Sequence, residues 1–269
     1  MATFDYSECN QRIARAHIHG QAAADIWNGL FVDNAYSIDT RVERDGVAVV
    51  KAVFSKPFGD GVNISLELGE MFYQLRAALD NATYKLAAFL RTPHPPANER
   101  HLYFPICSAQ RSFEDSSFNA NPFPDEFKAW IKSIQPCHIG KLTDPLQIYL
   151  GKVIESLNSF ANSDRHRRVH IAGIVPSNIE GYIELAKPGR ITFTEPMDTN
   201  FFEGKFELFR FGFEDIPNNK VQIKADLTPE IRVERLPIPP WNMLLEFVRA
   251  TSYVVERFEM VHAGKPLVL

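Results

Sequence analysis

The chain has 269 residues, 45% of them hydrophobic and 23% charged, an ordinary balance for a globular protein with a substantial core. Its net charge of -4 excludes a global cationic field that would recruit nucleic acid, so such binding needs a local basic patch. Cys9, Cys107 and Cys137 are too scattered for a disulfide framework or a C-x-x-C zinc site, which favours a reducing compartment. Without a signal peptide or a stretch of ~20 apolar residues, we expect a cytoplasmic protein with no membrane partner.

The first elements along the chain are a helix and a β-hairpin. Residues 7–30 carry a rough apolar helical face. Three residues interrupt this face and predict a bend or an early end: His17, His19 and Gly20. Residues 36–43 alternate apolar and polar side chains, and residues 47–54 return as a second strand. Asp45-Gly46 supplies the positive backbone angles of the tight turn between them.

A central helix is predicted over residues 68–89. Its apolar residues recur at helical spacing and define one buried face: Leu68, Phe72, Leu75, Leu79, Ala82, Leu86 and Phe89. Asn63 or Ser65 is expected as the N-cap. Arg76 and Asp80 stand beside the apolar stripe, four residues apart and therefore on the same side of the helix.

The middle of the chain reads as connections and two further helices. Residues 92–100 are rich in proline and cannot be helical, and residues 103–106 form a short extended piece. Residues 112–124 read as a polar loop, and residues 125–134 as a short helix. Asp144 to Gln147 marks a further helix start, with Asp144 as cap and Pro145 in the first turn, and apolar spacing continues to Leu157.

Beyond His170 the composition changes to short segments rich in β-branched and aromatic residues, typical of an antiparallel sheet. The expected strands are residues 171–175, 181–185, 190–194, 206–213, 221–225 and 231–234. The early hairpin is polar on one face and is expected to join this sheet, because a lone hairpin is marginally stable. A last helix begins after Pro239-Pro240, and Gly264 ends it.

The sequence therefore predicts an α+β protein. Its parts are a helical bundle over 1–168 with a β-hairpin at 36–54, an antiparallel β region over 169–236, and a C-terminal helix in 237–269 that packs back on the bundle. We expect these parts to form one integrated unit.

A second polar cluster, NSDRHRRVH at residues 162–170, is the candidate partner of Arg76 and Asp80. If the two clusters meet inside the bundle, Arg76 can pair with Asp164. Asp80 then has three candidate partners: Arg165, His166 and Arg167. The site is thus conjectured between the central helix and the 162–170 segment.

The motifs LGEMFYQLRAALDNATYKLA, YFPIC, SIQP and SLNSFANSDRHRRVH resemble, in order and spacing, a widespread family of uncharacterised bacterial proteins. That family's pattern runs L-R-S-A-L-D-H, F-P-I, L-Q-P and N-x-D-K-H-R. The resemblance covers roughly residues 36–170, with Asn81 in place of His and Arg165 in place of Lys. It implies no activity.

A looser resemblance is to HEPN helical domains, many of which are metal-independent ribonucleases with Arg, four to six residues, then His. In that family the Arg and His engage the scissile phosphate and the ribose hydroxyl. Three pairs fit the spacing: Arg165 and His170, Arg12 and His17, and Arg257 and His262. At the family's position on the central helix Arg76 is followed by Asn81, which cannot transfer a proton, so a nuclease centred there is expected to be inactive or weak.

The HEPN-like interpretation assigns roles to the two clusters and makes RNA or a nucleotide the candidate partner. The catalytic candidates are Arg76, Asp80, Asp164, His166 and Arg167. The substrate-binding candidates are Asn81, Asn162, Arg165 and His170. Whether the chain is an enzyme stays open at this point.

The alternative interpretation is a non-enzymatic binding or assembly module in which the charged cluster is a structural ion-pair network. A metal site at Asp80, Asp164, His166 and His170 is disfavoured because three arginines flank the histidines. No phosphate-loop, G-x-S-x-G or H-E-x-x-H motif is present, so we expect no cofactor. The phenylalanine-rich tail either fills the core or forms an exposed strip for a homodimer partner: Phe193, Phe201, Phe202, Phe206, Phe209, Phe211 and Phe213.

Overall fold

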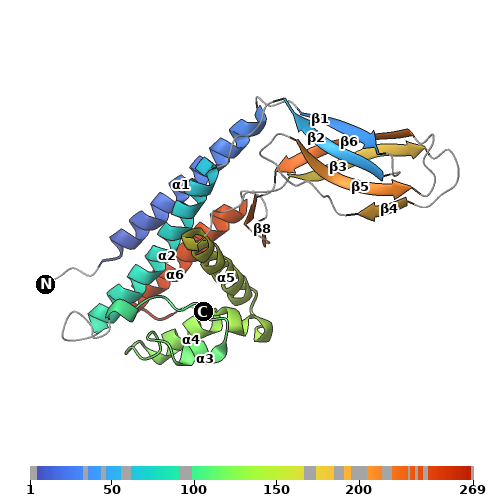
Figure 1. Cartoon of the computed structure of the whole chain (residues 1–269). Coiled ribbons are helices and arrows are strands. Elements are labelled where there is room, and N and C mark those ends of the chain that lie inside the picture. Colours follow the sequence, from blue (N-terminus) through green and yellow to red (C-terminus); the bar gives the residue numbers. More distant parts are fainter. Residues whose placement is uncertain are drawn as a thin grey trace. The chain divides into compact units, whose positions relative to one another are not determined.

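A computed structural model of the chain combines helices with antiparallel strands (Figure 1), which confirms the predicted α+β class. It describes residues 5–32, 36–43, 47–55, 62–90, 99–166, 174–184, 191–194, 205–213, 220–229, 231–233, 236–238 and 242–267. The chain divides into two compact units. The helical unit contains residues 1–22, 66–169 and 241–269, and the sheet unit contains residues 23–65 and 170–240.

The helical unit is built from parts of two long helices and from six further elements. The long helices are α1 (Ser7–Val32) and α2 (Val62–Leu90), whose residues 7–22 and 66–90 belong to this unit. The others are η1 (Glu99–His101), α3 (Gln110–Glu114), α4 (Asp125–Ser133), η2 (Pro136–Lys141), α5 (Pro145–His166) and α6 (Asn242–His262).

Aromatic side chains from four helices form the core of this unit. The ring of Phe72 on α2 stacks on Phe160 of α5 with centroids 4.8 Å apart, and Phe247 of α6 packs edge-on against both rings. Farther along α6, Phe258 packs edge-on against Phe127 of α4 at 4.9 Å. The predicted apolar faces of the separate helices therefore meet in one core, and α6 packs back on the other helices.

The predicted early end of the first helix is wrong, because α1 continues past His17, His19 and Gly20 to Val32. Contacts with α2 explain its continuity. A Cβ at Gly20 would lie 3.0 Å from the Met71 sulfur, so glycine lets the two helices approach closely. Nearby, His19 Nδ1 lies 2.7 Å from Glu67 Oε2. Tertiary packing here outweighs the weak helix propensity of glycine and histidine.

Two details of the central helix also differ from the prediction. The helix begins at Val62, so neither Asn63 nor Ser65 stands at its N-cap. Phe89 is 44% exposed rather than buried, and its ring stacks on His262 at 4.1 Å. The other predicted core positions of α2 are buried, because the i, i+3 and i+4 spacing holds until the helix reaches its end.

The signals for helix ends between α3 and α6 match the structure with one exception. Residues 112–124, predicted as a loop, begin inside the short helix α3. Asp144 caps α5 as predicted, because its Oδ1 accepts the Leu146 backbone N–H at 2.8 Å. Gly264 ends α6 with φ of 64°, and Lys265 N–H donates to the Met260 carbonyl at 2.9 Å, the closing bond of a Schellman motif.

The sheet unit contains a four-stranded antiparallel sheet in the order β1-β2-β5-β4. These strands are β1 (Tyr36–Val42), β2 (Val47–Phe54), β5 (Lys205–Phe213) and β4 (Ile191–Thr194). The early hairpin therefore joins the later strands, as predicted. Two further antiparallel pairs are β3 (Ile174–Glu184) with β6 (Lys220–Pro229), and β7 (Ile231–Val233) with β8 (Leu236–Ile238).

The sequence placed a break within β3 that the structure does not have. The predicted strands 171–175 and 181–185 belong, over their described parts, to one strand that pairs with β6 through an irregularity between Pro176 and Asn178. Phe211 is fully buried, which supports the core interpretation at that position. The side chains of the other six tail phenylalanines, and the predicted Asp45-Gly46 turn, lie outside the described residues.

Candidate functional site

Arg76 and Asp80, the pair singled out on the central helix, both bind the backbone of Phe104. Arg76 Nη2 donates to the Phe104 carbonyl at 2.7 Å, and Phe104 N–H donates to Asp80 Oδ1 at 2.9 Å. The two side chains also pair with each other, with Nη2 of Arg76 3.2 Å from Oδ1 of Asp80. Together they satisfy both polar groups of one residue in an extended segment, as a neighbouring strand would.

A third side chain closes this cluster from α5. Arg76 Nη1 donates to Asn158 Oδ1 at 3.3 Å. The Arg76 side chain is 13% exposed and the Asp80 side chain 30% exposed, so the ion pair is largely withdrawn from water. Because ion pairing is stronger where water is excluded, this pair contributes more to the fold than a typical surface pair.

Asn81 faces a different partner. Its Nδ2 donates to Glu8 Oε1 on α1 at 3.2 Å, and Glu8 also lies 3.6 Å from both Arg12 and Lys85. Although Asn81 follows Asp80 directly in sequence, its side chain contacts α1 rather than Phe104. Asn81 therefore has a structural contact here.

The second polar cluster is described only in part. Asn162 lies on α5 and is exposed. Asp164, Arg165 and His166 continue α5, but their side chains lie outside the described part of the chain. Arg167 and His170 lie outside it entirely. The pairings predicted between these residues and the central helix therefore stay predictions.

Two contacts join α5 to α2. Arg76 contacts Asn158, whereas Phe72, one turn earlier on α2, contacts Phe160, later on α5. Both Asn158 and Phe160 of α5 therefore contact α2 between Phe72 and Arg76.

The other Arg and His pairs with ribonuclease-like spacing have separate contacts. Arg12 donates to Gln74 Oε1 at 3.1 Å, while His17 is exposed. The Arg257 guanidinium lies 4.1 Å from the centroid of the Tyr253 ring. His262 stacks on Phe89 as described above. None of these contacts joins an Arg to the His of its own pair.

Cys107, three residues after Phe104, is held in a similar way. Its N–H donates to Gln135 Oε1 at 3.0 Å, and its carbonyl accepts the Cys137 N–H at 3.2 Å. Gln135 is fully buried, and its Nε2 donates to the Ile131 carbonyl at 3.0 Å. The extended segment is thus fixed at both ends, by α2 at Phe104 and by the turn after α4 at Cys107.

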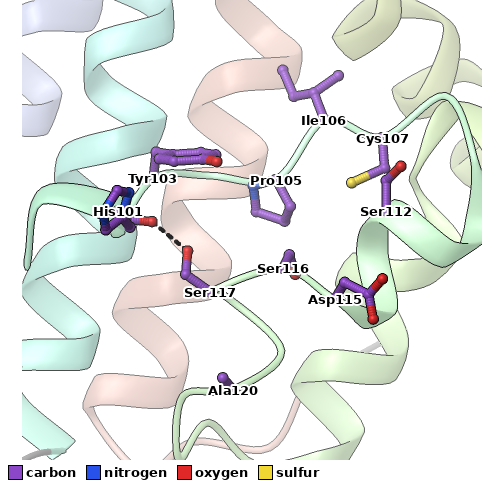
Figure 2. Close-up of a pocket in the computed structure, with 10 residues that line it drawn as sticks. All are labelled: His101, Tyr103, Pro105, Ile106, Cys107, Ser112, Asp115, Ser116, Ser117 and Ala120. Carbon is purple, nitrogen blue, oxygen red and sulfur yellow. Dashed lines mark hydrogen bonds between the residues drawn. The ribbon is translucent and has the colours of Figure 1, made fainter. Parts of the chain in front are cut away.

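This fixed segment forms one wall of a pocket of about 630 Å³, which Figure 2 shows in close-up. The opposite wall comes from α3 and the turn that follows it. The lining residues are His101, Tyr103, Pro105, Ile106 and Cys107 on the segment, and Ser112, Asp115, Ser116, Ser117 and Ala120 opposite. The Ser117 hydroxyl donates to the His101 carbonyl and ties the two walls together.

Sequence reasoning missed this pocket, although its signals were present. The YFPIC and SIQP motifs were noted for their order alone, and the structure brings them together with the Arg76–Asp80 pair. A buried glutamine that binds a distant backbone leaves no periodic pattern, so its partner could not be identified from the sequence.

The electrostatics of the pocket are those of a weakly charged site. Burial raises the pKa of the Cys107 thiol, the nearby Cys137 adds to this effect, and Arg76 opposes it. Among the ten lining residues no Lys or Arg occurs. Within the described part of the chain, no three His, Cys, Asp or Glu side chains gather as metal ligands would.

No family model matches the chain, and no curated protein and no solved structure matches it either. In the described part of the chain, every helix is too short or too polar to cross a membrane.

Proposed function

We propose that the chain is a non-enzymatic binding module. In this proposal the Arg76–Asp80 cluster is a structural bracket, and the pocket beside residues 104–107 receives a small ligand. The observation that carries the proposal is the double contact of Arg76 and Asp80 with Phe104. It fixes the pocket wall and occupies both members of the candidate catalytic pair.

The engagement of Arg76 argues against a catalytic role for this pair. An electrostatic catalyst must aim its donors at the place where charge develops on the substrate. The Arg76 donors instead bind oxygen atoms of three protein residues, Asp80, Phe104 and Asn158. Asp80 accepts the Phe104 N–H and pairs with Arg76, so its carboxylate is already engaged by protein groups.

The pocket chemistry favours a neutral ligand with an apolar body. Tyr103, Pro105 and Ile106 offer apolar surface, and no Lys or Arg on the lining attracts a phosphate. The hydroxyls of Ser116 and Ser117 already donate to backbone carbonyls, and Ser116 Oγ also accepts the Asn119 N–H, so what remains is chiefly the capacity of Ser117 to accept. A small molecule with an aromatic or aliphatic body and a hydroxyl or amide donor suits these groups.

Saturation-transfer NMR tests this proposal with phenol and benzamide as neutral probes and inorganic phosphate as the anionic probe. We expect signal transfer to the neutral probes, and we expect Ala120→Trp to abolish it by filling the pocket. The matched control is Ala129→Trp, an exposed position on α4 outside the lining, which should retain binding. Transfer to none of the neutral probes, or transfer that survives Ala120→Trp, would contradict the proposal.

An RNA-cleavage assay separates the proposal from the ribonuclease-like alternative. With a single-stranded RNA substrate, we expect no cleavage above that of a mock preparation. Cleavage that His166→Ala removes while the unfolding midpoint stays unchanged would establish the enzymatic alternative instead. The resemblance to HEPN domains, the homodimer and the cytoplasmic location stay predictions from the sequence.

A further inference from the structure

Cys107 and Cys137 are brought together by the backbone, although thirty positions of chain separate them. The Cys137 N–H donates to the Cys107 carbonyl at 3.2 Å. On its other side, the Cys107 N–H is bound by Gln135, two residues before Cys137. Cys107 is therefore held by Gln135 and Cys137 at the start of η2.

This contact sets a distance that a disulfide can span. One N–H···O bond with N and O 3.2 Å apart holds the Cα atoms of the two residues about 5–6.5 Å apart in ordinary hydrogen-bond geometry. Disulfides occur at Cα separations of roughly 4.4–6.8 Å. No large backbone movement is then needed, since the backbone bond that joins the two residues already brings them within this range.

The two thiols differ in their surroundings. Cys107 is 7% exposed, whereas Cys137 is half-buried and more open to water. Burial raises the pKa of the Cys137 thiol, and Lys141 and Lys132 oppose that rise. Because Cys137 is more open to water than Cys107, a peroxide reaches the Cys137 thiol first.

We propose that Cys107 and Cys137 form a redox-active dithiol that closes to a reversible disulfide in the presence of a peroxide. The Cys137 thiolate attacks one peroxide oxygen, the O–O bond breaks, and the leaving hydroxide takes a proton to become water. The resulting sulfenic acid carries the new S–O bond. The Cys107 thiolate attacks that sulfur, the S–S bond forms, and a second water leaves after protonation. The two thiols are oxidised by two electrons and hydrogen peroxide is reduced to two waters.

This inference does not depend on what the pocket binds, because it follows from the contact between the two cysteines. Cys9 provides an internal reference, since it is fully buried and burial raises the pKa of its thiol to about 11. The expected product is therefore a disulfide within one chain that leaves Cys9 reduced.

Mass spectrometry of the full chain after treatment with hydrogen peroxide tests the proposal. We expect the loss of two hydrogens, its reversal by dithiothreitol, and a cross-linked pair of peptides that contain Cys107 and Cys137. Alkylation after denaturation should label three cysteines in the reduced chain and one, Cys9, in the oxidised chain. A chain that keeps three labelled cysteines, or that pairs Cys9, overturns the proposal.

Single substitutions test the order of the two thiols. In Cys107→Ser, oxidation should stop at a sulfenic acid on Cys137, which dimedone traps. In Cys137→Ser, dimedone labelling of Cys107 should be much weaker under the same conditions. Equal labelling in both variants would refute the assigned order, and a disulfide-linked dimer of the unmodified chain on a non-reducing gel would refute the pairing within one chain.

Discussion

Arg76 and Asp80 bind opposite polar groups of one residue, because Arg76 donates to the Phe104 carbonyl and Asp80 accepts the Phe104 N–H. An isolated extended segment has no neighbouring strand to satisfy its backbone, and here two side chains take that place. Gln135 and the Cys137 backbone do the same for Cys107. The Arg76–Asp80 pair and the segments that contain YFPIC and SIQP thus meet around a short stretch of backbone.

The Arg76–Asp80 bracket predicts a loss of stability when it is broken. Asp80→Ala leaves a largely buried guanidinium and a part-buried N–H without their acceptor. We expect the free energy of unfolding to fall by about 2–4 kcal/mol, as for other buried pairs deprived of one partner. Urea unfolding followed by tryptophan fluorescence measures the change.

A matched control exists in the same unit. Arg111 and Asp115 are also four residues apart on a helix, but their side chains are 91% and 70% exposed. We expect Asp115→Ala to leave the urea midpoint unchanged, because exposed pairs contribute little. If Asp80→Ala and Asp115→Ala lower the free energy of unfolding equally, burial of the Arg76–Asp80 pair does not cause the loss.

Two helical glycines should respond in opposite directions to alanine. At Gly151 a Cβ would lie 2.8 Å from the Ile139 side chain and 3.3 Å from the Ile134 carbonyl, so we expect a loss of about 1–3 kcal/mol from overpacking. At Gly29 nothing lies within 4 Å, so the better helix propensity of alanine should stabilise α1 by about 0.5–1 kcal/mol. Thermal unfolding of both variants checks the signs, and a stabilised Gly151→Ala would contradict the packing of α5 against η2.

The contact between Tyr149 on α5 and Glu246 on α6 predicts an acid-dependent term in stability. The Tyr149 hydroxyl donates to Glu246, and this bond, together with Arg249, lowers the pKa of Glu246 below its ordinary value near 4.5. Since the folded pKa is the lower one, the contribution is present above pH 4.5 and is lost as the pH falls through the folded value.

Tyr149→Phe should therefore lower the free energy of unfolding by about 1 kcal/mol at pH 7. The difference from the unmodified chain should shrink as the pH falls below 4.5 through the lowered folded pKa of Glu246. Urea titrations across the acid range measure it. Tyr73→Phe, at a half-exposed position on α2, is the control and should show no difference at any pH; a Tyr149→Phe effect that is independent of pH would contradict the role of the carboxylate.

The end of α6 predicts a backbone effect. Gly264 has φ of 64°, a conformation that costs a residue with a Cβ roughly 1–2 kcal/mol. Gly264→Ala should lower the thermal midpoint, whereas Gly264→Asn should recover part of the loss. Gly140, which has open space around it, serves as the comparison for alanine. A Gly264→Ala variant as stable as Gly140→Ala would contradict the Schellman ending.

Much of the local structure could be predicted because local spacing carries it. The buried face of α2, the Asp144 cap and the Gly264 stop each depend on residues within a few positions of one another. The pairing of Arg76 with Asp80 was predictable for the same reason, since positions four apart share one side of a helix. Where packing competes with propensity, as at Gly20 against Met71, the prediction of an early helix end was wrong.

The sequence by itself determined most of the helices and strands, and that Arg76 and Asp80 lie side by side. Only the tertiary structure decided what this pair binds, because Phe104 lies 24 residues and Asn158 82 residues from the side chains they contact. Backbone geometry fixes neighbours at short range, whereas a hydrogen bond between distant residues exists only after the helices have buried their apolar faces together.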